Sequence, residues 1–132
     1  MASLRKDVLT EASTEVVWSA IRDIGALHTR LVPGFVVDTK LEPGARIVTF
    51  ANGMVVREPI VAIDDVAKRL VWSAQGGFTK HYNASAQVFA EVSGRTRVVW
   101  IADFLPDEAA SAIAAAMDAG AAAMQRALDA VA

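Results

Sequence analysis

Arg57 and Glu58 are the side chains in this sequence whose chemistry most needs an explanation. They lie next to each other in the stretch VVREPIVAID, Val55–Asp64, which is largely apolar and has the composition of a half-buried strand. Neighbouring side chains of a strand point to opposite faces, so one charge can face water while the other faces the core. A carboxylate in an apolar cavity would have a raised pKa, as a general acid or base near neutral pH requires. Alternation alone does not decide which charge points inward.

Few other residue types offer catalysis or metal binding. The chain has no cysteine and two histidines, His28 and His81, and neither lies in a zinc-binding pattern. We therefore expect no metal and no cofactor. His28 is expected on a solvated helix face. His81 follows a glycine-rich turn and is a possible proton carrier, although hydrogen bonding at a strand edge is the commoner role.

Composition and charge limit the class of protein. The 132 residues fit a single domain covering residues 1–132, and the 13 basic residues are scattered in a chain of net charge −2. Without a basic stripe, nucleic-acid binding is not expected. No apolar run approaches the roughly 18 residues of a membrane span, and the first charges come too early for a signal peptide. We expect a soluble, cytoplasmic protein without membrane insertion.

The elements that must position these residues follow a simple order. An opening strand, LRKDVLTEA, precedes a helix with Ser13 as its N-cap and a second short helix that ends at Pro33-Gly34. A long helix opens at Pro106 and has an apolar stripe of Ile113, Met117, Gly120, Met124, Leu128 and Val131. Between the helices, turn signals separate six strands: FVVDTKLE, ARIVTFA, MVVREPIVAID, RLVWSAQ, KHYNASAQVFAEV and RTRVVWIADFL. The pattern predicts an α+β protein with an antiparallel meander.

The last two strands allow a prediction of which face lines the core. With Ser93-Gly94 as a two-residue turn, Val92 pairs with Arg95. The face toward the long helix then holds Asn83, Ser85, Gln87 and Phe89 with Val98, Trp100, Ala102 and Phe104. The outer face holds Tyr82, Ala84, Ala86 and Val88 with Arg97, Val99, Ile101 and Asp103. A shift of one residue would instead turn the three amide and hydroxyl side chains toward water.

This order of elements resembles the START-like, Bet v 1-like (SRPBCC) superfamily. The resemblance implies a helix-grip fold, in which a seven-stranded curved antiparallel sheet (β-α-α-β6-α) wraps around the C-terminal helix and encloses a ligand cavity. More closely, the sequence is similar to small bacterial polyketide cyclase/dehydrase and lipid-transport proteins. This resemblance covers most of the chain, but it does not include a catalytic signature. The stretches that carry the resemblance are ASTEVVWSAIRDIGAL, PGFVVDTKLEPGARIVTF, REPIVAIDDVAKRLVW and GRTRVVWIADFLPDE.

The resemblance also bears on Arg57 and Glu58. Plant hormone receptors of the superfamily carry a ligand-contacting Glu six residues before an Asp-Asp turn, and Glu58 stands at the same spacing before Asp64-Asp65. Glu58 is therefore expected to face the cavity and Arg57 the solvent. The alternative is that Glu58 pairs with Arg46 or another cation of a neighbouring strand. The residues expected to bind a ligand are Glu58, Trp72, Asn83, Ser85, Gln87, Trp100, Met117 and Met124.

Three functions remain open. The favoured one is binding of a small hydrophobic molecule, such as a lipid, polyketide or aromatic, between the sheet and the helix. The second is a cyclase or dehydratase in which Glu58, helped by His81 or Asn83, moves protons on a folded substrate. The third is a regulatory interaction module without a ligand. The sequence leaves the oligomeric state open, a homodimer included.

Overall fold

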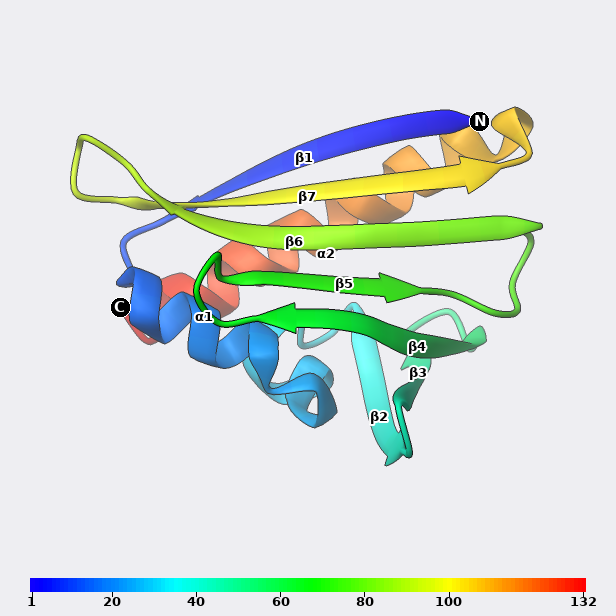
Figure 1. The fold of residues 1–132 in the computed structure, drawn as a ribbon, viewed down its shortest axis with the longest axis horizontal. Coiled ribbons are helices and arrows are strands. Elements are labelled where there is room, and N and C mark those ends of the chain that lie inside the picture. The colour runs from blue at the N-terminus through cyan, green and yellow to red at the C-terminus, as the bar shows by residue number, and fades with distance from the viewer.

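The computed structural model describes all 132 residues, and it forms one curved antiparallel sheet against a long C-terminal helix (Figure 1). The strands are β1 (Ala2–Thr10), β2 (Val36–Glu42), β3 (Ala45–Phe50), β4 (Val55–Asp64), β5 (Arg69–Ser73), β6 (His81–Ala90) and β7 (Thr96–Leu105). The helices are α1 (Thr14–Arg22), the short turns η1 (Ile24–Ala26), η2 (Leu27–Leu31) and η3 (Asp107–Ala109), and α2 (Ala110–Ala130). The predicted α+β helix-grip architecture is confirmed.

The strand order β1-β7-β6-β5-β4-β3-β2 is a meander in which the first strand pairs with the last. β4 changes partner along its length: residues 55–59 pair with β3, and residues 60–64 pair with β5 across an irregularity after Ile60. The sheet bends there, so that β2 and β3 turn away from the long strands in Figure 1. This bend gives the sheet a concave face over which α2 lies.

The ends of the helices follow local chemistry. The Ser13 side chain accepts a hydrogen bond from the backbone N–H of Val16, as its role as N-cap of α1 predicts. The long helix proper begins at Ala110, after the 3-10 turn that follows Pro106. Its predicted apolar stripe is buried from Ile113 to Leu128. Val131 is an error in that prediction, because the helix ends at Ala130 and the side chain is 61% exposed.

The predicted pairing of β6 with β7 is wrong by one residue. Val88 lies opposite Val98 and Ala90 opposite Thr96, and the backbone N–H of Glu91 donates to the carbonyl of Arg95. The loop therefore has three residues, closed by a glycine in the left-handed region (Gly94, φ +87°), instead of the two that the Ser-Gly pair suggested.

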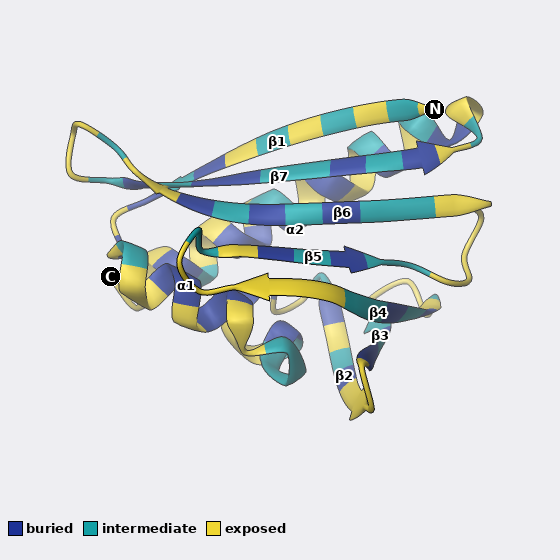
Figure 2. Cartoon of the chain, viewed as in Figure 1, coloured by how far each residue is buried: buried dark blue, intermediate teal, exposed yellow.

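That shift reverses the two faces of β6 and leaves those of β7 as predicted. The concave face of β6 carries Tyr82, Ala84, Ala86 and Val88, whereas Asn83, Ser85, Gln87 and Phe89 lie on the outer face. Figure 2 shows the resulting alternation of burial along the strand.

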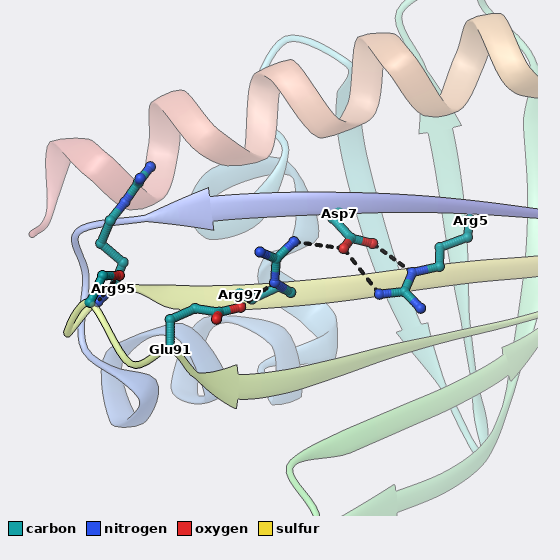
Figure 3. A network of polar contacts seen from close by, with 6 residues as sticks. Arg5, Asp7, Glu91, Arg95 and Arg97 are labelled. Carbon is teal, nitrogen blue, oxygen red and sulfur yellow. Dashed lines mark hydrogen bonds and ion pairs between the residues drawn. The ribbon is translucent and has the colours of Figure 1, made fainter.

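The outer face of the sheet is polar, as the positions of Arg97 and Asp103 predicted. Arg97 contacts Glu91 and also donates from Nη1 to Asp7 Oδ2 at 2.7 Å, while Arg5 Nε donates to Asp7 Oδ1 at 2.7 Å (Figure 3). The hydrogen bond from Arg5, followed by that from Arg97, holds the pKa of Asp7 below its usual value. These charged side chains are thus paired with one another at the surface of the sheet.

None of the helices has the length and the apolar composition needed to span a membrane.

Candidate functional site: a cavity between the sheet and α2

The concave face of the sheet and α2 enclose a cavity of about 490 Å³. Twenty-two of its 28 lining residues are hydrophobic, and they come from α1, η2, strands β2 to β7 and α2. The volume lies within the range of about 300–1,000 Å³ that is usual for small-molecule sites, which are likewise mostly apolar with a few polar groups. The fold therefore provides a partly open apolar cavity of the size of a small organic molecule.

The cavity opens between two loops and the middle of α2. Its solvent-exposed lining residues come from the β3–β4 turn (Ala51 and Asn52), the β5–β6 loop (residues 76–78) and α2 (Ala115 and Ala116). Phe78 at the tip of the β5–β6 loop is 52% exposed although it lines the cavity. Exposed residues that also line the cavity mark the path by which a ligand can enter.

A closed ion pair lies in the cavity wall. Arg46 of β3 and Glu58 of β4 are opposed in register, and Arg46 Nε donates to Glu58 Oε1 at 2.8 Å. The two residues are only 2% and 7% exposed, and both line the cavity. Glu58 thus faces inward as predicted, and it also has the Arg46 partner of the alternative. Its role toward a ligand stays a prediction.

Neighbouring groups hold the guanidinium in place. Arg46 Nη1 donates to the carbonyl of Ile24 at 3.4 Å, and the guanidinium carbon lies 5.6 Å from the ring centroid of Trp72. A cation at this distance over an indole is attracted by its ring electrons. Arg57, the neighbour of Glu58, points to the other face, where it contacts Glu42 and is 41% exposed. The two charges of the opening stretch are therefore separated between cavity and solvent, as predicted.

The electrostatics of the pair are dominated by burial. Loss of water raises the pKa of Glu58 above its usual value, and the charge and hydrogen bond of Arg46 offset this only in part. Tyr82 of β6 also lines the cavity, and its pKa is raised, first by burial and then by the negative charge of Glu58. Its hydroxyl therefore stays protonated and can donate a hydrogen bond into the cavity.

The structure brings together five of the residues predicted to bind a ligand and separates the others from them. The cavity lining includes Glu58, Trp72, Trp100, Met117 and Met124. The lining does not include His81, Asn83, Ser85 or Gln87, which the corrected register places on the outer face.

Three of these outward side chains have hydrogen-bond partners there. His81 Nε2 lies 2.7 Å from Asn83 Oδ1, and Asn83 Nδ2 donates to Asp103 Oδ2 at 3.0 Å. Gln87 donates to the carbonyl of Ala67 at 3.2 Å. His81 and Asn83 are therefore not placed to assist Glu58 in proton transfer. His28 also lies outside the cavity, half-buried, with Nδ1 3.0 Å from Thr39 Oγ1.

The sequence did not predict Tyr82 as a cavity residue. It gave Arg46 only as a possible ion-pair partner of Glu58, in the alternative to a ligand-binding role. Tyr82 was assigned outward by the mistaken register, and a three-residue loop signal at Gly94 would have turned it inward.

Gly120 also has a role that the helical pattern alone does not reveal. A Cβ at this position would lie 3.0 Å from Cη2 of Trp100, so the glycine lets this ring of the cavity wall pack against the helix.

The comparisons with known proteins agree with this fold. The family model described as polyketide cyclase / dehydrase and lipid transport matches residues 1–132, and the chain belongs to this family. Its fold is that of the START-like and Bet v 1-like proteins. No match was found among curated proteins.

Three solved structures illustrate the similarity. XoxI from Bacillus cereus is 22% identical with a TM-score of 0.86, and the alignment covers 97% of this chain and 96% of that one. A START superfamily protein from Mycobacterium smegmatis is 12% identical with a TM-score of 0.79, over 98% and 99% of the two chains. The Zhui aromatase/cyclase from a Streptomyces species is 15% identical with a TM-score of 0.73, over 96% and 90%. At these identities the likeness establishes the fold alone.

Proposed function

We propose that the protein binds a small hydrophobic molecule, such as a lipid, polyketide or aromatic compound, in the cavity between the sheet and α2. The observation that carries this proposal is the cavity of about 490 Å³ with 22 hydrophobic residues among its 28 lining residues. Such a space lowers the free energy of an apolar ligand by about 25 cal/mol for each Å² that it removes from water. The description of the family and the aromatase/cyclase among the similar structures support the same ligand class.

The test is a binding screen with a variant that obstructs the entrance. Ligands that bind only the native state raise the melting temperature by mass action, with about 2.7 kcal/mol of stabilisation at a concentration of 100 Kd. We expect apolar compounds to stabilise the wild-type protein and the variant Ala116→Trp to lose this effect, because Ala116 lines the mouth. Ala119→Trp is the matched control, since Ala119 is exposed on the same helix outside the lining.

Native mass spectrometry of the purified protein provides a second measurement, because a bound molecule would appear as an adduct. An unshifted melting temperature across lipids, polyketides and aromatics, together with the absence of an adduct, would contradict ligand binding. That result would favour the regulatory interaction module.

A cyclase or dehydratase activity is the second candidate, favoured by the raised pKa of Glu58 beside the protonated Tyr82. Glu58 would move the proton and Tyr82 would donate a hydrogen bond to a substrate oxygen, while the cavity holds a reactive conformer. Glu58→Gln should then abolish turnover of a polyketide substrate while a substrate analogue still binds. Equal turnover in the variant would exclude this mechanism.

A further inference from the structure

The polar end of the cavity contains one cation and one anion. Arg46 and Glu58 are the only charged residues among the 28 that line it, and Tyr82 of β6 is the other titratable group facing Glu58. The other elements of the lining, namely α1, η2, β2, β5, β7 and α2, contribute no charged side chain. With both members of the pair ionised, the charges of the wall cancel. A ligand head group therefore meets a neutral pair instead of an isolated charge.

The pair leaves one guanidinium nitrogen and one carboxylate oxygen without a hydrogen bond in the chain. Its hydrogen bonds engage Nε and Nη1 of Arg46 and Oε1 of Glu58, which leaves Nη2 and Oε2 without a partner in the chain. Because the residues are 2% and 7% exposed, bulk water reaches them little, and the cavity is the space in which these atoms can find a partner. Neither atom is sealed off from the cavity, so a ligand that displaces water there gains affinity when it restores these hydrogen bonds.

On the basis of the proposed function, we infer that the ligand carries a neutral hydroxyl head group, an alcohol or a phenol, that accepts from Nη2 of Arg46 and donates to Oε2 of Glu58. A hydroxyl has one donor and two acceptor positions, so a single oxygen can serve both atoms. The rest of the molecule is apolar and fills the hydrophobic part of the cavity.

Charged head groups fit this pair less well. A carboxylate has acceptors only, and it would place a second negative charge beside Glu58 in a site of low dielectric constant. An ammonium group would repel the guanidinium of Arg46 in the same way. The inference therefore separates alcohols and phenols from free fatty acids and other organic acids, although all of them share an apolar body.

The experiment compares ligands that share one body and differ in the head group. 9-Anthracenemethanol, anthracene-9-carboxylate and anthracene are titrated by fluorescence at about pH 8, and 1-dodecanol and dodecanoate are compared by thermal shift as a second body. We expect the alcohol to bind the wild-type protein at least about tenfold more tightly than the carboxylate, because the carboxylate loses water beside a pair with no net charge to compensate it and lies next to Glu58. It should also bind more tightly than anthracene, which cannot satisfy the free donor and acceptor.

Glu58→Gln removes the negative charge and keeps the shape of the side chain. We expect the preference for the alcohol to shrink by about tenfold or more in this variant, because the carboxylate then meets the charge of Arg46 alone. Glu42→Gln is the matched control. Glu42 contacts Arg57 outside the cavity lining, so its variant should keep the wild-type preference.

The outcomes separate the two proposals. The head-group inference is overturned if the wild-type protein binds either the carboxylate or anthracene as tightly as it binds the alcohol. Hydrophobic binding would still stand in that case. If no compound of either body binds, both proposals are overturned. The wild-type comparison decides the inference even if Glu58→Gln does not fold.

Discussion

Arg46 and Glu58 form an ion pair of 2.8 Å that lies inside the protein, in the wall of a cavity that is otherwise apolar. Two charges removed from water cost several kcal/mol each, and their attraction repays this only when geometry and hydrogen bonding are good. A pair of apolar residues could close the same position in the sheet. The buried pair is therefore costly to maintain, and the stability of the protein should depend on both members being present.

The first prediction concerns the dependence of Glu58 on Arg46. Arg46→Met removes the partner that lowers the pKa of Glu58, so the carboxylate is left either charged and unpaired or protonated. We expect a loss of about 3–5 kcal/mol in the free energy of unfolding when Glu58 is ionised, because breaking a buried pair leaves an uncompensated charge. The loss should be smaller at low pH. Urea unfolding at several pH values measures it.

Arg57→Met is the control for this prediction. Arg57 makes its ion pair with Glu42 at the surface, where the side chains are 41% and 38% exposed. Its removal should change the free energy of unfolding by less than about 1 kcal/mol. An Arg46→Met variant as stable as Arg57→Met at every pH would contradict the view that the buried pair is coupled.

The second prediction concerns the part of the pH dependence of the free energy of unfolding that comes from Glu58. Its pKa in the folded state is raised above the usual 4.5, so the native protein holds this proton to a higher pH than the unfolded chain does. The stabilising contribution of Glu58 to the free energy of unfolding is therefore complete below about pH 4.5. It is lost as the pH rises through the raised pKa of the folded state. The variant Glu58→Gln has no titratable group at this position and therefore lacks this contribution.

The free energy of unfolding of the wild-type protein, minus that of Glu58→Gln, should therefore fall as the pH rises from about 5 to 9. Paired urea titrations across this range provide the measurement. A difference that stays constant, or that grows with pH, would show that the folded pKa of Glu58 is not raised.

The third prediction tests the close packing of Gly120 against Trp100. A leucine at position 120 would place atoms where a Cβ already lies 3.0 Å from the Trp100 ring and 3.1 Å from Phe35. We expect Gly120→Leu to destabilise the protein by about 1–3 kcal/mol, because overpacking forces the neighbours to shift. Ala119→Leu is the control, since Ala119 is exposed on the same helix. Thermal unfolding of both variants decides whether the close contact exists.

The order of elements could be predicted from the sequence because it depends on strong local signals. Turn pairs such as Asn52-Gly53 and the Ser13 cap mark the ends of elements without any tertiary information. The orientation of Glu58 was predicted through a family spacing, since alternation left it undecided. The faces of β6 could not be read in the same way, because a loop of two residues and one of three differ by one residue at Gly94, and a one-residue shift turns every side chain of a strand over.

The last prediction uses this shift to test the site itself. Tyr82 points into the cavity and Asn83 points out, so the two neighbours should respond in opposite ways to a ligand. Tyr82→Phe removes only the hydroxyl. We expect it to weaken binding of 9-anthracenemethanol by about 0.5–1.5 kcal/mol, the usual net value of one hydrogen bond. Asn83→Ala removes the bond to Asp103 at the surface and should leave the affinity unchanged. Fluorescence titration of the two variants gives the comparison, and a loss of affinity in Asn83→Ala but not in Tyr82→Phe would restore the register that the sequence first suggested.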